Sequence, residues 1–190
     1  MVEDYFKVRV FDAVRVALPL RYVETVLQVN RQQICPIPGL STSLLGVINR
    51  RGALTWVLDL RQFLSDLPPA QLSRNLTTVV LTVEGSTAEE GEGTLRRSIA
   101  CIVTELEGVF PSPALKPFSK PVKPRLQEFF AGIATHEKSG VAVLDPVALL
   151  DVLHQESIGV TEPKLDLYAP FNPIAPPVNA LPKSPQPALN

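Results

Sequence analysis

Two histidines and two cysteines are the side chains whose types most readily suggest chemistry in this sequence. His136 and His154 are its only histidines, and neither has a second plausible metal ligand at helix or strand spacing. Cys35 and Cys101 stand in apolar surroundings, without the close pairing that metal sites use. We therefore expect solvated surface histidines, small buried cysteines, no metal and no cofactor.

The carboxylates and glycines that could serve a catalyst fit structural roles better. Asp59 and Asp145 each precede a short amphipathic stretch, where a carboxylate can accept hydrogen bonds from the first amides of a helix. The glycines form neither a GxGxxG motif nor a P-loop, so turn geometry or close strand contact explains them better. Since the sequence also shows no nucleophile with a base, we expect a protein that is not an enzyme.

Two adjacent arginines, Arg50 and Arg51, stand in a predicted tight turn between two apolar strands within residues 44–60. A rigid hairpin would fix their positions while leaving both guanidinium groups free to pair with carboxylates on a partner. The competing interpretation is that they are ordinary solubilising residues, and on the residues alone it is the stronger one.

Composition limits the classes of partner. The chain has 190 residues, of which 45% are hydrophobic, enough for a buried core. A net charge of −1 and 6% aromatic residues argue against nucleic acid, because neither a basic groove nor stacking side chains are evident. No apolar run is long enough to cross a bilayer, and the first residues lack the basic start of a signal peptide. We expect a cytoplasmic protein without membrane insertion.

The first part of the chain predicts a β-hairpin followed by irregular connections. Apolar residues alternate with polar ones over 8–18 on either side of Asp12 and Ala13, which is typical of antiparallel strands. The apolar spacing over 23–27 favours one turn of helix, with Glu24 on its wetter side. Prolines make 34–39 an edge or connector, and Ser41 is expected to cap a short turn through Leu45.

The second part predicts strands where β-branched residues recur and helices where short amphipathic runs follow them. The expected strands span residues 77–83, 98–104, 129–135 and 141–144, and the expected helices span 60–67 and 146–154. Residues 84–97 are predicted to be a mobile inserted loop. Five prolines over 111–124 predict an irregular connection that no strand or helix can occupy.

An internal echo suggests two related small barrels. Residues 46–59 contain Gly-Val-Ile-Asn, a second glycine and Val-Leu-Asp, and residues 132–145 contain Gly-Ile-Ala-Thr, a second glycine and Val-Leu-Asp. Such weak self-similarity favours two barrels over one large sandwich, and strands from opposite ends of the chain could be shared between them. We expect this domain to span 3–156, followed by a proline-rich, disordered tail over 157–190.

The motif Leu-Gly-Val-Ile-Asn-x-Arg-Gly at 45–52, continued by Val-Leu-Asp-Leu-Arg at 57–61, closely resembles the signature of CheW-like domains. Residues 6–38 also resemble the opening of that domain, with the same segments in the same order. CheW-like domains are non-catalytic adaptors that couple chemoreceptors to the histidine kinase CheA. The resemblance implies an all-β fold of two small five-stranded barrels, SH3-like or OB-like, with short helices.

The resemblance also implies site residues. Arg51 occupies the position of the arginine that belongs to the receptor-coupling surface in this family, and Glu24 and Gly46 match two further positions on it. Glu24 and Gly46 could equally be a solvated charge and a packing glycine. Arg50 departs from the family, which usually has leucine there, and puts in doubt the local packing or the partner. Trp56 stands where the family commonly has proline, and we expect it to be a packing residue.

The implied partners are a methyl-accepting chemoreceptor and a CheA-type kinase, with recruitment to membrane receptor arrays through them. The alternative within the same class is a scaffold of a pilus-motility or phototaxis pathway. A small enzyme and a barrel that binds single-stranded nucleic acid are the rival classes, and both lack the residues they would need.

Overall fold

The computed structural model describes residues 2–65, 71–85, 95–118, 124–137 and 139–158. Most of the loop predicted over 84–97 and nearly all of the tail predicted over 157–190 lie outside these residues. Our expectations of mobility and disorder for those two segments therefore stay predictions.

Ten strands form two five-stranded sheets, which confirms the all-β prediction. The first, called barrel A here, has the order β8 (Glu105–Ser112), β1 (Glu3–Phe11), β2 (Val14–Pro19), β10 (Ser139–Leu144) and β9 (Phe130–His136). The second, barrel B, has the order β3 (Val23–Asn30), β6 (Asn75–Gly85), β7 (Leu95–Ile102), β5 (Ala53–Asp59) and β4 (Leu44–Arg50). The helices are α1 (Leu60–Leu64), α2 (Pro124–Gln127) and α3 (Pro146–Ile158), with single 3₁₀ turns at Leu20–Tyr22 and Arg31–Gln33.

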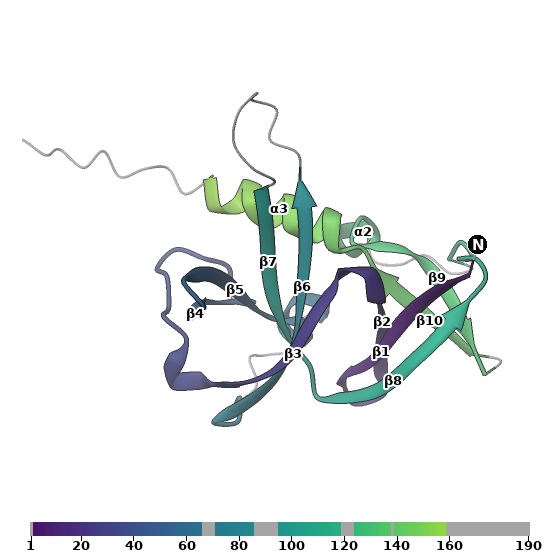
Figure 1. The fold of residues 1–190 in the computed structure, drawn as a ribbon, viewed down its shortest axis with the longest axis horizontal. Coiled ribbons are helices and arrows are strands. Elements are labelled where there is room, and N and C mark those ends of the chain that lie inside the picture. The colour runs from purple at the N-terminus through teal and green to yellow at the C-terminus, as the bar shows by residue number, and fades with distance from the viewer. Residues whose placement is uncertain (1, 66–70, 86–94, 119–123, 138, 159–190) are drawn as a thin grey trace, which may run out of the picture. The chain divides into compact units, whose positions relative to one another are not determined.

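Barrel A is assembled from both ends of the described chain, as the sequence left open. β2 pairs in parallel with β10, with Val16 opposite Ala142 and Ala17 opposite Val143. Figure 1 shows the purple strands β1 and β2 beside the green strands β9 and β10. Barrel B uses only the middle of the chain, from β3 to β7.

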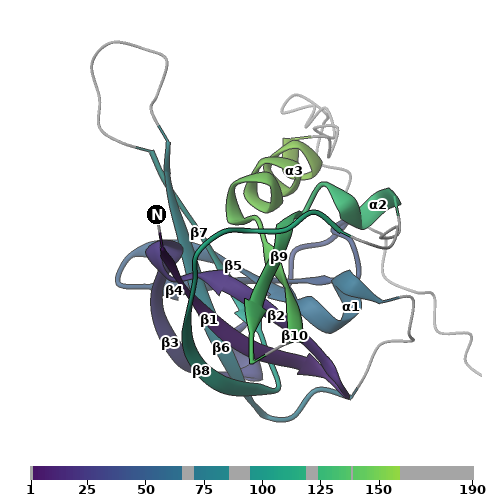
Figure 2. The ribbon, with the colours of Figure 1, turned by 90° about the vertical axis from the view of Figure 1, so that its right-hand side faces the viewer.

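The main core lies between the two barrels, and each barrel also has a small core of its own. In β7, Ile99 and Cys101 belong to the main core while Ala100 and Ile102 face the interior of barrel B. Strands buried on both faces need apolar residues at every position, and the continuous apolar runs in the sequence reflect this. Helix α3 adds Leu149 to the main core and lies beside β6 and β7 (Figure 2).

Each barrel is closed in the same way, by one isolated β-bridge between the segment after its first edge strand and its last edge strand. Cys35 makes a single antiparallel bridge to Val47 in barrel B, and Lys116 makes one to Ile133 in barrel A. The residue before each bridge partner is a glycine with positive φ, +134° at Gly46 and +147° at Gly132. A Cβ atom would lie 2.1 Å from the Cys35 carbonyl oxygen at Gly46 and 2.9 Å from the Lys116 carbonyl oxygen at Gly132. The repeated sequence motif therefore begins, in both copies, at a glycine whose Cα must lack a side chain because a backbone carbonyl packs against it.

Two expectations for the first part of the chain are wrong. Residues 23–27 form the first half of β3 and not a helical turn, because pairing with β6 outweighs a weak local preference. Ser41 does begin a short turn, because its carbonyl oxygen accepts a hydrogen bond from Leu44, but the turn does not continue through Leu45, since Leu44 already begins β4.

The proline-rich segment is also more regular than expected. β8 was not predicted, and it includes Pro111, since an edge strand tolerates a residue without an amide hydrogen. Pro124 begins α2, a position that needs no amide donor. Lys116 makes the closing bridge described above.

The capping aspartates are confirmed, but one cysteine is not where we expected it. Asp59 accepts hydrogen bonds from the amides of Arg61 and Gln62, and Asp145 accepts equivalent bonds at the start of α3. Cys101 is buried, and burial raises the pKa of its thiol to about 12. Cys35 is exposed, although its backbone forms the single bridge that closes barrel B.

The contact between Gly46 and the Cys35 carbonyl predicts that two alanine substitutions lower the free energy of unfolding by different amounts. Gly46→Ala should lower the free energy of unfolding by at least about 3 kcal/mol, since it adds both a backbone strain and a clash with a main-chain oxygen. Gly52→Ala, at φ +88° with no atom within 4 Å of the added carbon, should cost only about 1–2 kcal/mol. Chemical denaturation of both variants measures the difference. Equal costs would contradict the proposed role of the Cys35 carbonyl.

Candidate functional site

The turn between β4 and β5 is a two-residue loop made of Arg51 and Gly52. Arg50 pairs with Ala53 across it, and both loop residues have positive φ, 51° and 88°. These angles are those of the hairpin turn whose twist matches that of the flanking strands. The amide of Gly52 donates to the side-chain oxygen of Asn49 at 2.9 Å, which fixes the turn.

Arg51 is exposed at this turn and has no recorded partner. Within the described ranges, the structure gives its side chain no hydrogen bond and no ion pair. The prediction of a free guanidinium on a rigid hairpin therefore fits this residue.

Arg50 differs from the expectation, because its guanidinium is not free. It is 18% exposed, and its two terminal nitrogens donate to the two carboxylate oxygens of Glu24 at 2.9 and 3.3 Å. Thr82 on β6 donates to the same carboxylate at 2.7 Å. We call Glu24, Arg50 and Thr82 the Glu24 clamp, since it joins β3, β4 and β6 where the two edge strands share no ladder.

The Glu24 clamp lowers the pKa of its carboxylate. The hydrogen bonds from Arg50 and Thr82 lower the pKa of Glu24 to about 2, from an ordinary value of 4.5. A second guanidinium, that of Arg96, lies 3.5 Å from the carboxylate and acts in the same direction. Glu24 is therefore an ion-paired carboxylate that joins three strands of barrel B, and it lies on a strand and not on a helical turn.

Gly46 lies away from this turn, four residues before Arg50 on β4, against the Cys35 carbonyl. The structure thus brings Arg50 and Glu24 together, places Arg51 next to them in sequence, and gives Gly46 a packing environment. Trp56 lies on β5, half-buried against the main core, as expected for a packing residue.

Barrel A contains a second clamp that sequence reasoning missed. Glu107 is the extra residue of a bulge in β8, as Glu24 is in β3, and it accepts hydrogen bonds from Arg15 at 2.7 and 2.8 Å. Lys7 lies 3.3 Å from Glu107 and 3.4 Å from Nδ1 of His136. Desolvation opposes ionisation of Glu107, but the bonds from Arg15 and Lys7 outweigh it and lower its pKa.

His136 corrects a further expectation. It ends β9, is half-buried, and its ring centre lies 4.5 Å from that of Phe110, so it is not a solvated turn residue. It follows Gly132 by four positions, as Arg50 follows Gly46. Only this spacing in the sequence could have linked the two clamps. His154 lies within α3.

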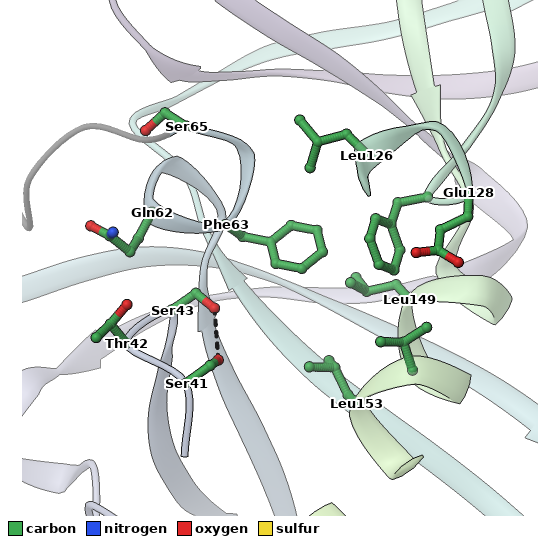
Figure 3. A pocket seen from close by; sticks show the side chains of 12 residues that line it. Ser41, Thr42, Ser43, Gln62, Phe63, Ser65, Leu126, Glu128, Leu149 and Leu153 are labelled. Carbon is green, nitrogen blue, oxygen red and sulfur yellow. Dashed lines mark hydrogen bonds between the residues drawn. The ribbon is translucent and has the colours of Figure 1, made fainter. Parts of the chain in front are cut away.

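A separate groove of about 570 Å³ is bordered by residues 41–43, α1, the segment around α2 and α3. Phe63 and Phe129 meet there edge to face, with ring centres 4.8 Å apart, and Leu149 and Leu153 belong to the main core (Figure 3). The lining offers hydroxyls, apolar side chains and the carboxylate of Glu128. It includes neither Arg51 nor any residue of the Glu24 clamp.

The pKa of Glu24 predicts a pH-dependent contribution to stability. Because its folded-state pKa of about 2 lies below the ordinary 4.5, the contribution is complete above about pH 4.5 and is lost as the pH falls towards 2. Glu24→Gln should therefore unfold at a lower temperature than the unmodified chain at pH 7. The two melting temperatures should converge at low pH.

The matched control is Glu84→Gln, which changes an exposed glutamate on β6, two residues after Thr82. It should leave the melting temperature unchanged at both pH values. A Glu24→Gln deficit that stays constant from pH 7 to pH 2 would show that the clamp stabilises the barrel by something other than its charge.

Comparison with known proteins agrees with this architecture. A family model described as the CheW-like domain matches residues 4–154. The solved structure of the scaffolding protein TtCheW from Thermoanaerobacter tengcongensis superposes with a TM-score of 0.59 at 17% identity, covering 76% of this chain and 90% of that chain. At this identity the likeness concerns the fold. Among curated proteins, no match is found.

Two further findings accompany the match. In the part of the chain that is described, no helix is both long enough and apolar enough to cross a bilayer. Members of the matched family are non-catalytic scaffolds of chemotaxis signalling. With nearly all of the two-barrel region matched, the chain belongs to the CheW-like domain family.

Proposed function

We propose that this protein is the adaptor that couples a methyl-accepting chemoreceptor to a CheA-type histidine kinase in the cytoplasm. The observation that carries the proposal is the exposed Arg51 on a turn fixed by Asn49 and flanked by the Glu24 clamp. A guanidinium carried on a rigid turn can bind a partner carboxylate without a further loss of backbone entropy.

The mechanism needs binding and orientation only. The adaptor would hold receptor and kinase at a high effective concentration, and it can transmit only the free energy by which two receptor states differ. Individual contacts of this kind bury little surface, below about 1,200 Å² in total. Clustering of many copies through their partners would supply the missing strength by multivalency.

Within the proposed surface, the three residues suggested by the family and the neighbouring Arg50 have different tasks. Arg51 would contact the receptor directly. Arg50 and Glu24 would hold the turn in place through the clamp, and Gly46 would keep β4 closed against the Cys35 carbonyl. The same arrangement would serve a pilus-motility or phototaxis pathway, since it recognises a receptor or kinase and not the output.

The proposal predicts that Arg51→Glu folds normally but loses receptor coupling. Glutamate keeps the exposed position and the backbone geometry, while the reversed charge repels a partner carboxylate. Receptor control of kinase activity in a reconstituted mixture should weaken at least about tenfold, or ~1.4 kcal/mol of binding free energy. Circular dichroism and thermal melting should match those of the unmodified protein.

Arg31→Glu serves as the control, because Arg31 is also exposed but lies in the 3₁₀ turn that follows β3, at the end far from Glu24. It should leave coupling intact. Normal receptor control of the kinase in Arg51→Glu would remove Arg51 from the binding surface.

A further inference from the structure

We propose that residues 163–176 of this chain, called the tail segment here, bind as a polyproline II helix in the groove bordered by residues 41–43, α1 and α3. The tail segment lies outside the described residues, whereas the groove lies within them. This contact is separate from the proposed coupling surface at the turn between β4 and β5.

The tail segment repeats an apolar side chain at every third position. The repeat consists of Leu165, Tyr168, Phe171 and Ile174. Prolines recur with the same period at 170, 173 and 176. A polyproline II helix has three residues per turn, so the apolar side chains would share one face of it and the prolines another. Since proline disfavours both α-helix and paired strand, this extended helix is the conformation that the spacing fits.

The groove has the kind of lining that such a helix binds. Aromatic grooves recognise proline-rich segments, because a preformed polyproline II helix loses little entropy when it docks. Phe63 meets Phe129 edge to face in this groove (Figure 3), and Phe63 and Val152 are only half-buried. The apolar face of the tail segment would cover side chains that the described residues leave partly exposed.

Two polar groups of the groove match groups of the tail segment. Gln62 Oε1 is buried and has no hydrogen-bond partner within the described residues. Backbone amides of a polyproline II helix make no internal hydrogen bonds, so one of them can donate to this oxygen. Glu128 is the one charged residue among the described residues that line the groove, and Lys164 stands directly before the apolar repeat. Opposite charges therefore complement each other at the rim.

The chain is long enough to bring the tail segment back to the groove. α3 ends at Ile158, and Leu153, which lines the groove, lies five residues earlier, about 7.5 Å along the helix. Leu165 comes seven residues after Ile158, and seven extended residues span about 23 Å. So short a tether gives the tail segment a high effective concentration, which lets a weak contact form.

The test measures amide hydrogen exchange in the full chain. Tyr168→Ser/Phe171→Ser removes two side chains of the apolar repeat, so exchange over residues 41–43 and α1 should become at least fivefold faster. The matched control, Val178→Ser/Leu181→Ser, removes two apolar side chains beyond the tail segment and should leave this exchange unchanged. Exchange over β7 should be the same in all three proteins, which checks the fold. Equal exchange over residues 41–43 and α1 in the unmodified chain and in Tyr168→Ser/Phe171→Ser would overturn the proposal.

A charge exchange tests how the tail segment is oriented. Glu128 is exposed, so Glu128→Lys should keep the fold and speed exchange over residues 41–43 at least twofold, and adding Lys164→Glu should restore the slow exchange. A double variant that exchanges as fast as Glu128→Lys alone would contradict the pairing of Lys164 with Glu128. Protection that rises with protein concentration would show that a second copy supplies the tail segment, and docking within one chain would then be wrong.

Discussion

In each barrel, a backbone carbonyl packs against a glycine Cα at the point where the first and last strands of the sheet must meet. Cys35 faces Gly46 in barrel B and Lys116 faces Gly132 in barrel A, and both glycines have positive φ. A side chain at either position would hold the bridging segments apart. The closed barrels, the buried faces of their strands and the fixed direction of the β4–β5 hairpin all depend on this contact.

The two barrels share a plan but differ at their ends. A bulge glutamate forms a clamp in each barrel. Arg50 is a partner of Glu24 in barrel B, whereas Arg15 and Lys7 are the partners of Glu107 in barrel A, and Lys7 also contacts His136. The turn residues that follow, Arg51 and Glu137, both have positive φ and carry opposite charges. One architecture thus holds two chemically different turns.

Much of the fold could be predicted because it depends on local patterns. The alternation of apolar and polar residues predicted the β1–β2 hairpin. The repeated Val-Leu-Asp predicted the capping aspartates of α1 and α3. β3 was missed because its pairing with β6 is long-range, and β8 was missed because prolines conceal an edge strand. At the site, Arg51 could be recognised as exposed, but the pairing of Arg50 with Glu24, 26 residues away, depends on barrel closure and has no local signal.

We assign recognition to the turn between β4 and β5, whereas the groove bordered by α1 and α3 is a candidate docking surface elsewhere on the described residues. Amide hydrogen exchange distinguishes the two directly, because contact slows exchange where the partner sits. With a receptor fragment and kinase bound, the account predicts that added protection is strongest over residues 50–54. Protection confined to residues 41–43 and α3, with the turn between β4 and β5 unchanged, would contradict it.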